Sequence, residues 1–295
     1  MNLRQLKSKI KSVGNVGKIT KAMQLVSAVK MKKAQLRASQ GKPYRDALDE
    51  TIYQIGGKNV AFEHPFMKEN GKATRKLAIV ISSNKGLCGV FNFNLFKFLL
   101  VQIPDFARYD FVVMGSKAQQ FLFHVGGSII ADFSSQMPFE ANTTAVFSLV
   151  RDKFLGGSYS SIELFYNQFV SSLSCKPTKK MLLPIHFEEE ESRITNHGSK
   201  MKDETQGIKK EYIVEPDQKT VLEGLFNFYL ESDIRGAIHE SEASEHSARM
   251  IAMKNATDNS TDLVSRLTLL RNGLRQEKIT NELLDMNTAK LAVAA

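Results

Sequence analysis

Apolar and small residues near the C-terminal end of the chain follow the spacing of a long helix. No proline follows Pro216, and only three glycines interrupt the stretch from Lys219 to Val293. A stretch of this length without a strong breaker exceeds an ordinary helix of about 8 to 20 residues and suggests a coiled coil or a helical repeat. Alternating steps of four and three predict a coiled-coil seam at Ala256, Ser260, Leu263, Leu267, Leu270 and Leu274. One or two ordinary core helices joined by a bend are the alternative.

The N-terminal end carries a second pattern of this kind. Apolar residues again step by three and four, with one additional step of three, at Leu3, Leu6, Ile10, Val13, Val16, Ile19, Met23 and Val26. An additional step of three is a stammer, which overwinds a coiled coil locally, and we expect it at Gly14 to Gly17. The helix is expected to continue through Ile52 and Ile55 and to stop at Gly56-Gly57. The two terminal helices would then bury their narrow apolar stripes on each other as an antiparallel pair.

Between the two terminal helices the period of the pattern changes. Short runs rich in β-branched residues predict strands at Lys76–Ser82, Tyr109–Gly115, Ser128–Phe133, Ile162–Val170 and Met181–Phe187. Helical spacing predicts helices at Phe91–Ile103, at Ser116–Val125 with Ser116 as the N-cap, and at Asn142–Leu155. Strands that alternate with helices indicate an α/β layer fold with a parallel-rich sheet.

The predicted fold class is therefore α/β, with a long antiparallel coiled coil of the N- and C-terminal helices and a Rossmann-like α/β domain. The expected divisions are the N-terminal helix 1–57, the α/β domain 74–187, a polar loop and connection 188–216, and the C-terminal helix 217–295.

The composition narrows the class of protein. A hydrophobic fraction of 42% and a charged fraction of 24% are typical of a soluble globular protein. No apolar run approaches 18 residues, so direct membrane insertion is not expected. Two cysteines are too few for a disulfide framework, which favours a reducing compartment. The six histidines show no metal-ligand spacing, and no nucleophile–base set or carboxylate pair emerges, so we predict neither a metal nor an active site.

Positive charge is concentrated at the N-terminal end. Residues 1–45 contain twelve Lys and Arg and no acid, whereas residues 217–295 contain twelve acids and nine bases. Basic helices of this kind bind nucleic acid, anionic lipid or an acidic protein surface. A merely solvated face would normally mix both signs. A basic coiled-coil nucleic-acid-binding protein remains an alternative, although no aromatic residue lies among the bases before Tyr44 and no DNA-binding motif appears.

The loop Ser82 to Gly89 follows the first predicted strand, where a doubly wound fold places a phosphate site. It contains neither the G-x-G-x-x-G nor the Walker pattern. A tight glycine turn that lets the strand and the next helix pack is the better interpretation, with Cys88 as a small packed residue. We therefore predict no nucleotide and no other cofactor.

Segments in three parts of the chain resemble the gamma subunit of F-type ATP synthases. The opening of that family is similar to Ser12-Val13, Lys18 to Met23, Val26 to Ala28 and Lys30 to Ala34. Its C-terminal signature is similar to Ser244 to Met253, Asn255 to Thr257 and Arg275 to Leu283. Its middle is similar to Ser82 to Asn92, Tyr166 to Phe169, Leu182 to Pro184 and Glu215 to Asp217, in the same order.

The resemblance implies a non-catalytic rotor shaft, turned by proton flow, that forces the catalytic sites through different states. The terminal helices would lie inside a ring of alternating alpha and beta subunits, and the α/β domain would meet the epsilon subunit and the membrane ring of c subunits. The family's catch contacts fall on Arg275, Gln276 and Thr280. Met23 and Lys30 fall where the N-terminal helix faces an acidic loop of the beta subunit.

The resemblance also implies a cellular location. The chain lacks the inserted segment with paired cysteines that is typical of chloroplast gamma subunits, and it starts on the shaft without a removable leader. We therefore expect a bacterial protein that is peripheral on the cytoplasmic side of the plasma membrane.

Overall fold

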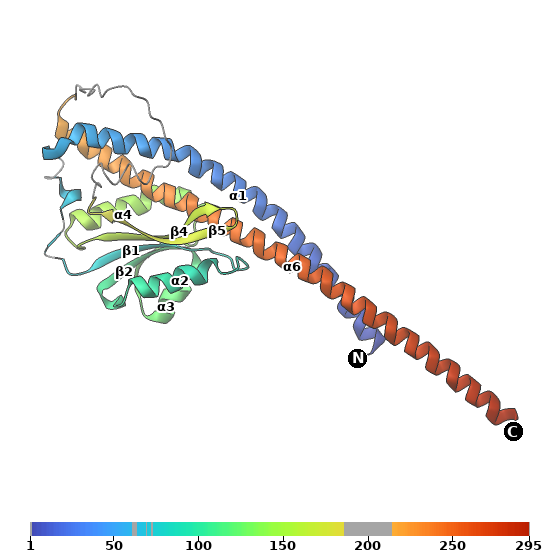
Figure 1. Cartoon of the computed structure of the whole chain (residues 1–295). Helices are drawn as coiled ribbons and strands as arrows, with labels where there is room; N and C mark the ends of the chain where they lie inside the picture. The colour runs from blue at the N-terminus through green and yellow to red at the C-terminus, as the bar shows by residue number, and fades with distance from the viewer. Residues whose placement is uncertain (1, 61–63, 69, 72, 186–213, 295) are drawn as a thin grey trace.

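A computed structural model describes residues 2–60, 64–68, 70–71, 73–185 and 214–294. A layered sheet domain (residues 73–185) lies beside one half of a long rod made of the two terminal helices (Figure 1). Most of the polar loop expected at 188–216 lies outside the described residues.

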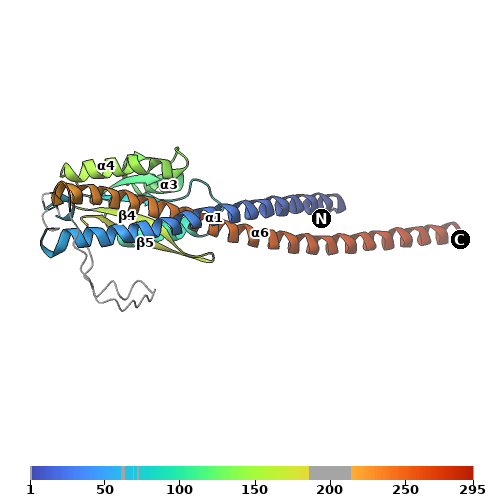
Figure 2. The same cartoon turned by 90° about the horizontal axis from the view of Figure 1, so that it is seen from above.

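The rod consists of helices α1 (Leu3–Val60) and α6 (Gln218–Ala294), which run antiparallel (Figure 2). The predicted stop at Gly56-Gly57 is wrong, because α1 continues to Val60. Each glycine costs about 1 kcal/mol of helix propensity, whereas helix stability in proteins comes mainly from the packed face. That packing is present here, since Ile52 is buried in the main hydrophobic core.

The sheet has five strands in the order β3-β2-β1-β4-β5. Strands β1 to β4 are parallel neighbours and β5 pairs antiparallel with β4. Their bounds are β1 Lys76–Ile81, β2 Tyr109–Met114, β3 Ser128–Asp132, β4 Ile162–Ser171 and β5 Ser174–Leu183. The parallel-rich sheet is thus confirmed.

The last strand differs from the prediction. We expected it at Met181–Phe187, whereas β5 begins at Ser174 and residues 186 and 187 lie outside the described part of the chain. Its first half contains lysines and Pro177, so it has no apolar run to reveal it. An edge strand tolerates charged residues and proline because one of its sides needs no ladder hydrogen bonds.

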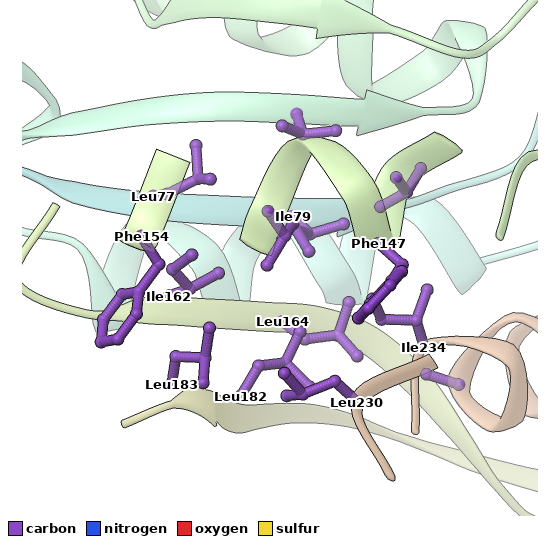
Figure 3. Close-up of a cluster of buried hydrophobic side chains, with 14 of the residues drawn as sticks. Leu77, Ile79, Phe147, Phe154, Ile162, Leu164, Leu182, Leu183, Leu230 and Ile234 are labelled. Carbon is purple, nitrogen blue, oxygen red and sulfur yellow. The ribbon is translucent and has the colours of Figure 1, made fainter. Parts of the chain in front are cut away.

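Helices cover both faces of the sheet. On one face lie α2 (Phe91–Gln102) and α3 (Ser116–Val125), and on the other lie α4 (Thr143–Leu155) and α6. Side chains of β1 alternate between two cores accordingly: Ala78 and Val80 face α2 and α3, and Leu77, Ile79 and Ile81 face α4 and α6. Figure 3 shows the core on the face covered by α4 and α6, where Leu230 and Ile234 of α6 pack against Leu164 of β4. Helix α6 is therefore part of the sheet domain's own core.

The start of α3 uses a different cap from the predicted one. Gly115, with φ +114°, is the N-cap, and Ser116 makes no capping hydrogen bond. The loop after β1 supplies the acceptors instead: Asn84 Oδ1 accepts from the Ser116 amide at 2.8 Å, and Ser82 Oγ accepts from the Ala118 amide at 2.9 Å. A Cβ at Gly115 would collide with the Ser82 carbonyl, so this close approach requires glycine.

Candidate functional site in the paired helices

The seam of α1 is an unbroken heptad pattern, so the predicted stammer is wrong. Val16, Ile19 and Val26 are 48%, 60% and 56% exposed and lie off the seam. A continuous series of buried and half-buried residues steps by four and three: Leu6, Ile10, Val13, Gly17, Thr20, Gln24, Ser27, Met31 and Ala34. The apolar pattern predicted the wrong seam positions because small and polar residues occupy the seam, while larger apolar residues stand next to them in the sequence.

The seam of α6 shows the same preference. Ala256, Ser260, Leu267 and Leu274 are buried or half-buried as expected, whereas Leu263 and Leu270 are 42% and 48% exposed. The observed alternation of four and three runs through Met253, Thr257, Ser260, Val264, Leu267, Arg271 and Leu274. Small residues let the helices approach closely: a Cβ at Gly17 would lie 3.2 Å from Ser260 Cβ.

The outer surface of the rod carries many apolar side chains. They lie on α1 at Val16, Ile19, Leu25, Val26, Val29 and Leu36, and on α6 at Leu263, Leu269, Leu270, Ile279, Leu283, Leu284 and Met286. Exposed apolar residues in this number along one element are typical of a surface that a partner covers. Ten of the twelve basic residues in 1–45 are also exposed, while Arg37 and Arg45 are half-buried. The rod is thus suited to a partner that encloses it with apolar and acidic surfaces.

The end of α6 projects beyond its partner helix (Figure 2). Leu274 is the last half-buried seam residue, and every described side chain from 275 to 288 is exposed. The twenty helical residues from 275 to 294 correspond to about 30 Å of single helix. A lone helix of this length is marginal in water, which again favours an enclosing partner.

The residues expected to contact partners fall into two separate groups. On α1, Met23 is half-buried and Lys30 is exposed. Both lie in the middle of the helix pair, close to Thr20, which contacts Thr257 of α6. Arg275, Gln276 and Thr280 are exposed on the projecting end of α6. Thr280 Oγ1 donates to the Gln276 carbonyl at 3.0 Å, and no other hydrogen bond within the described residues involves these three side chains. The structure does not bring the two groups together.

Helix α6 crosses the carboxyl ends of β1 and β4. Ser244 Oγ donates to the Asn167 carbonyl at 3.0 Å, and Arg249 Nη2 donates to the Lys85 carbonyl at 3.0 Å. A Cβ at Gly89, which has φ +58°, would already lie 3.7 Å from Ala252 Cβ. Strand order reverses between β1 and β4, and open α/β sheets bind ligands at that place. In this chain, side chains of α6 occupy that place.

Cys88 lies in the same loop and is only 2% exposed. Asn92 Nδ2 donates to its sulfur at 3.3 Å, and Ser83 Oγ lies 3.7 Å from the sulfur. This environment matches the predicted small packed residue.

A cluster of charged groups lies where α1 and α6 leave the sheet domain, and sequence reasoning missed it. Burial raises the pKa of Glu240 and Glu245, and burial together with the Glu245 carboxylate raises the pKa of Glu242 to about 7. Burial lowers the pKa of His239, and it lowers the pKa of His246 to about 4. The available signal was three acids spaced by two and three on the helix that packs against the basic α1.

Comparisons with known proteins agree with this architecture. A family model described as ATP synthase matches residues 2–293. The ATP synthase gamma chain of Psychrobacter arcticus is 35% identical over 303 aligned residues and is matched over 99% of both chains. The gamma chain of Glaesserella parasuis is 36% identical over 299 residues, which cover 98% of this chain and 99% of that relative. This chain belongs to the ATP synthase gamma chain family.

Solved structures have the same fold as this gamma chain. One is a chain of the Euglena gracilis mitochondrial ATP synthase, from an assembly described as OSCP/F1/c-ring, with a TM-score of 0.65, 19% identity, and coverage of 99% of this chain and 94% of that chain. Another comes from the central stalk and c-ring of the Tetrahymena thermophila mitochondrial enzyme, with a TM-score of 0.56, 21% identity, and coverage of 81% and 99%. The expected union of paired terminal helices with a parallel-rich sheet is confirmed.

The described part of this gamma chain contains neither a helix that could span a membrane nor a cluster of metal ligands. No helix there combines the length and the apolarity that crossing a membrane requires. No group of three or more His, Cys, Asp or Glu side chains among the described residues is placed to hold a metal ion.

Proposed function

We propose that this gamma chain is the central-stalk rotor subunit of a bacterial proton-translocating F-type ATP synthase. The observation that carries the proposal is the rod itself, a two-helix shaft with a projecting single-helix end and an exposed apolar and basic surface. Proton flow through the membrane ring would turn the sheet domain and the rod together. ATP synthesis or hydrolysis would take place on the catalytic subunits around the rod.

The proposed partners follow from this role. The alpha and beta subunits of the F1 ring enclose the rod, and the epsilon subunit and the c-subunit ring meet the sheet domain. The assemblies named for the solved relatives, a central stalk with its c-ring and an F1/c-ring assembly, support this arrangement. The relatives reported above are ATP synthase proteins, which gives the nucleic-acid alternative no support.

The subunit itself performs no catalysis in this proposal. The place where an α/β sheet would hold a nucleotide is filled by Ser244 and Arg249 of α6. Arg275, Gln276 and Thr280 contact the catalytic ring at the projecting end, and Met23 and Lys30 face the acidic beta loop. A single exposed ion pair contributes only ~0 to 1 kcal/mol, so a basic surface guides a turning shaft without locking it at one angle.

The proposed location is the cytoplasmic side of the bacterial plasma membrane, with the chain held there as a peripheral subunit. The bacterial relatives support a bacterial setting. Attachment would occur through protein partners rather than by insertion.

Reconstitution tests the proposal. Membrane vesicles containing the other subunits, with and without this chain, are assayed for ATP-driven proton pumping, and the pure chain is titrated with ATP by calorimetry. We expect pumping only when the chain is present and no ATP binding by the chain alone. Micromolar ATP binding, or equal pumping without the chain, would contradict the proposal. Salt-sensitive retention of the pure chain on DNA would favour the nucleic-acid alternative.

A further inference from the structure

The seam between the two helices has few features that fix its register. From Gly17 to Ala34 four of the six seam positions of α1 hold small residues, and the other two hold half-buried longer side chains: Gly17, Thr20, Ser27 and Ala34, and Gln24 and Met31. Large side chains fix the register of a coiled coil because each one enters a defined hole of the partner helix. Small residues let the two helices approach closely, but they enter the holes of the partner helix only slightly. The register therefore needs to be held elsewhere along the pair.

A charged residue occupies one of the seam positions nearer the sheet domain. Continuing the alternation beyond Ala34 leads through residues 38 and 41 to Arg45, and then to the buried Leu48 and Ile52. The Arg45 side chain is only 17% exposed. A single polar residue at a core position of a coiled coil specifies its register at a cost in stability.

The guanidinium of Arg45 lies in a notch of α6 that only glycine provides. A Cβ at Gly236 would collide with Arg45 Nη1 and would lie 2.6 Å from its Cζ. One turn further along α6, Glu240 Oε1 lies 3.6 Å from Arg45 Nη2, and the Glu240 side chain is 19% exposed. The arginine is thus restrained both by shape and by charge.

The same part of α6 is attached to the sheet. Lys180 Nζ of β5 lies 2.8 Å from Asp233 Oδ2, and the Asp233 carboxylate is buried. Tyr166 of β4 is also buried, and burial together with the Glu240 and Asp233 carboxylates raises the pKa of its phenol. The notch that receives Arg45 therefore belongs to a segment of α6 that cannot move independently of the sheet domain.

We propose that Arg45 is a positioning residue that fixes the axial and rotational register of α1 on α6, so that rotation of the sheet domain reaches both helices of the shaft together. It acts through Gly236 and Glu240 and contacts no reacting group. The inference rests on the rotor function proposed above. Without this contact, the small-residue seam permits α1 to slip along α6 under load.

The register is tested first on the full-length chain, by the distance between spin labels at exposed positions 33 and 254 in a Cys88→Ser/Cys175→Ser background. We expect Arg45→Met to broaden the distance distribution or to shift it by up to one helical turn, about 5.4 Å. Gly236→Ala leaves every charge in place and fills the notch, so it should produce the same change. Arg45→Lys keeps the charge without the planar guanidinium and should rescue only partly.

Arg37→Met is the matched control. Arg37 is also an α1 arginine in an ion pair, with Nη1 2.9 Å from Glu140 Oε2, but its partner lies on the short helix η4 (Phe139–Asn142) and its side chain is 40% exposed. Loss of the Arg37–Glu140 ion pair should leave the distance between the two spin labels unchanged. An equal change in Arg37→Met would show that any lost α1 ion pair loosens the seam, and would overturn the specific role of Arg45.

The consequence is tested in the reconstituted complex by measuring ATP-driven proton pumping at equal ATP hydrolysis. Mutations on a coupling path typically change coupling by about twofold or more, and we expect such a loss for Arg45→Met and Gly236→Ala but not for Arg37→Met. Unchanged label distances and unchanged pumping in both variants would overturn the inference while leaving the rotor function intact. If the wild-type chain itself failed to restore pumping, the rotor function would fail instead. Gly236→Ala keeps the test decisive if Arg45→Met does not fold.

Discussion

The hydroxyl oxygens of Thr20 and Thr257 lie 2.8 Å apart across the seam of the helix pair. Each hydroxyl is also close to a carbonyl of its own helix, Thr20 at 3.0 Å from Gly17 O and Thr257 at 2.8 Å from Met253 O. The two hydroxyl groups have one proton each but make three contacts. One threonine therefore donates to the other across the seam, while the other donates to a carbonyl of its own helix. The two helices are therefore joined in the middle of the rod by a polar contact between two seam residues.

The first prediction concerns this contact. Thr20→Val keeps the shape of the side chain and removes the hydrogen bond across the seam, but Thr257 can still donate to Met253 O. We expect a loss of about 0.5 to 1.5 kcal/mol in the free energy of unfolding of the isolated chain, measured by urea titration. Thr261→Val is the control, since the exposed Thr261 donates to the Thr257 carbonyl of its own helix. An equal loss in both variants would contradict a contribution from the seam.

The second prediction compares two glycines of α1. Replacing a helical glycine by alanine normally stabilises by about 0.5 to 1 kcal/mol. A Cβ at Gly14 meets nothing within 4 Å, whereas a Cβ at Gly17 would lie 3.2 Å from Ser260 Cβ. We expect Gly14→Ala to give the full stabilisation and Gly17→Ala to give less, because the helices must separate slightly. Equal thermal stabilisation of the two variants would show that the seam is not tightly closed at Gly17.

The sheet domain and the two long helices could be predicted from the period of the apolar pattern alone. The strands β1 and β2 are buried on both faces and therefore appear as nearly continuous apolar runs, and the first six residues of β4 are buried as well. The projecting end of α6 could also be predicted, since it follows from the unequal lengths of the two helices. These features depend on local patterns that the chain carries in consecutive residues.

The seam and its anchorage could not be predicted in the same way. A hydrophobicity argument selects Leu263 over Val264, and Val16 over Gly17, because it ranks apolar size above closeness of approach. The contact of Arg45 with Gly236 joins residues far apart in the chain, so neither position attracts attention by itself. The polar strand β5 is positioned by its pairing with β4, which a search for apolar runs does not detect.

The third prediction concerns pH. The Glu242 carboxyl faces Glu245 on its own helix, Lys30 and Arg37 of α1, and Glu140 of η4, and its pKa is raised from 4.5 to about 7, chiefly by burial. Below about pH 4.5 the group is protonated in both states and costs nothing. Between pH 4.5 and 7 the unfolded chain ionises first, so stability is lost as the pH rises.

Glu242→Gln removes this titration. We expect the variant to be more stable than the wild type at pH 8 by about 1 to 3 kcal/mol, with the difference shrinking toward pH 5. Urea unfolding at the two pH values measures it. Glu277→Gln, at an exposed position on the projecting end of α6, is the control and should change little at either pH. A Glu242→Gln advantage that is the same at pH 5 and pH 8 would rule out this carboxyl as the source.

The last prediction separates partner contact from stability at the projecting end of α6. Arg275 is exposed beyond the last seam residue, and Arg266 is also an exposed arginine, on the paired part of the same helix. Because neither side chain is buried, Arg275→Ala and Arg266→Ala should each change the unfolding free energy of the isolated chain by less than about 0.5 kcal/mol. In the reconstituted complex, Arg275→Ala should lower ATP hydrolysis and ATP-driven proton pumping, and Arg266→Ala should lower them less. Equal activity of the two variants would place the catch contact elsewhere on the rod, whereas a loss of stability in Arg275→Ala alone would mean that this arginine supports the helix rather than a partner.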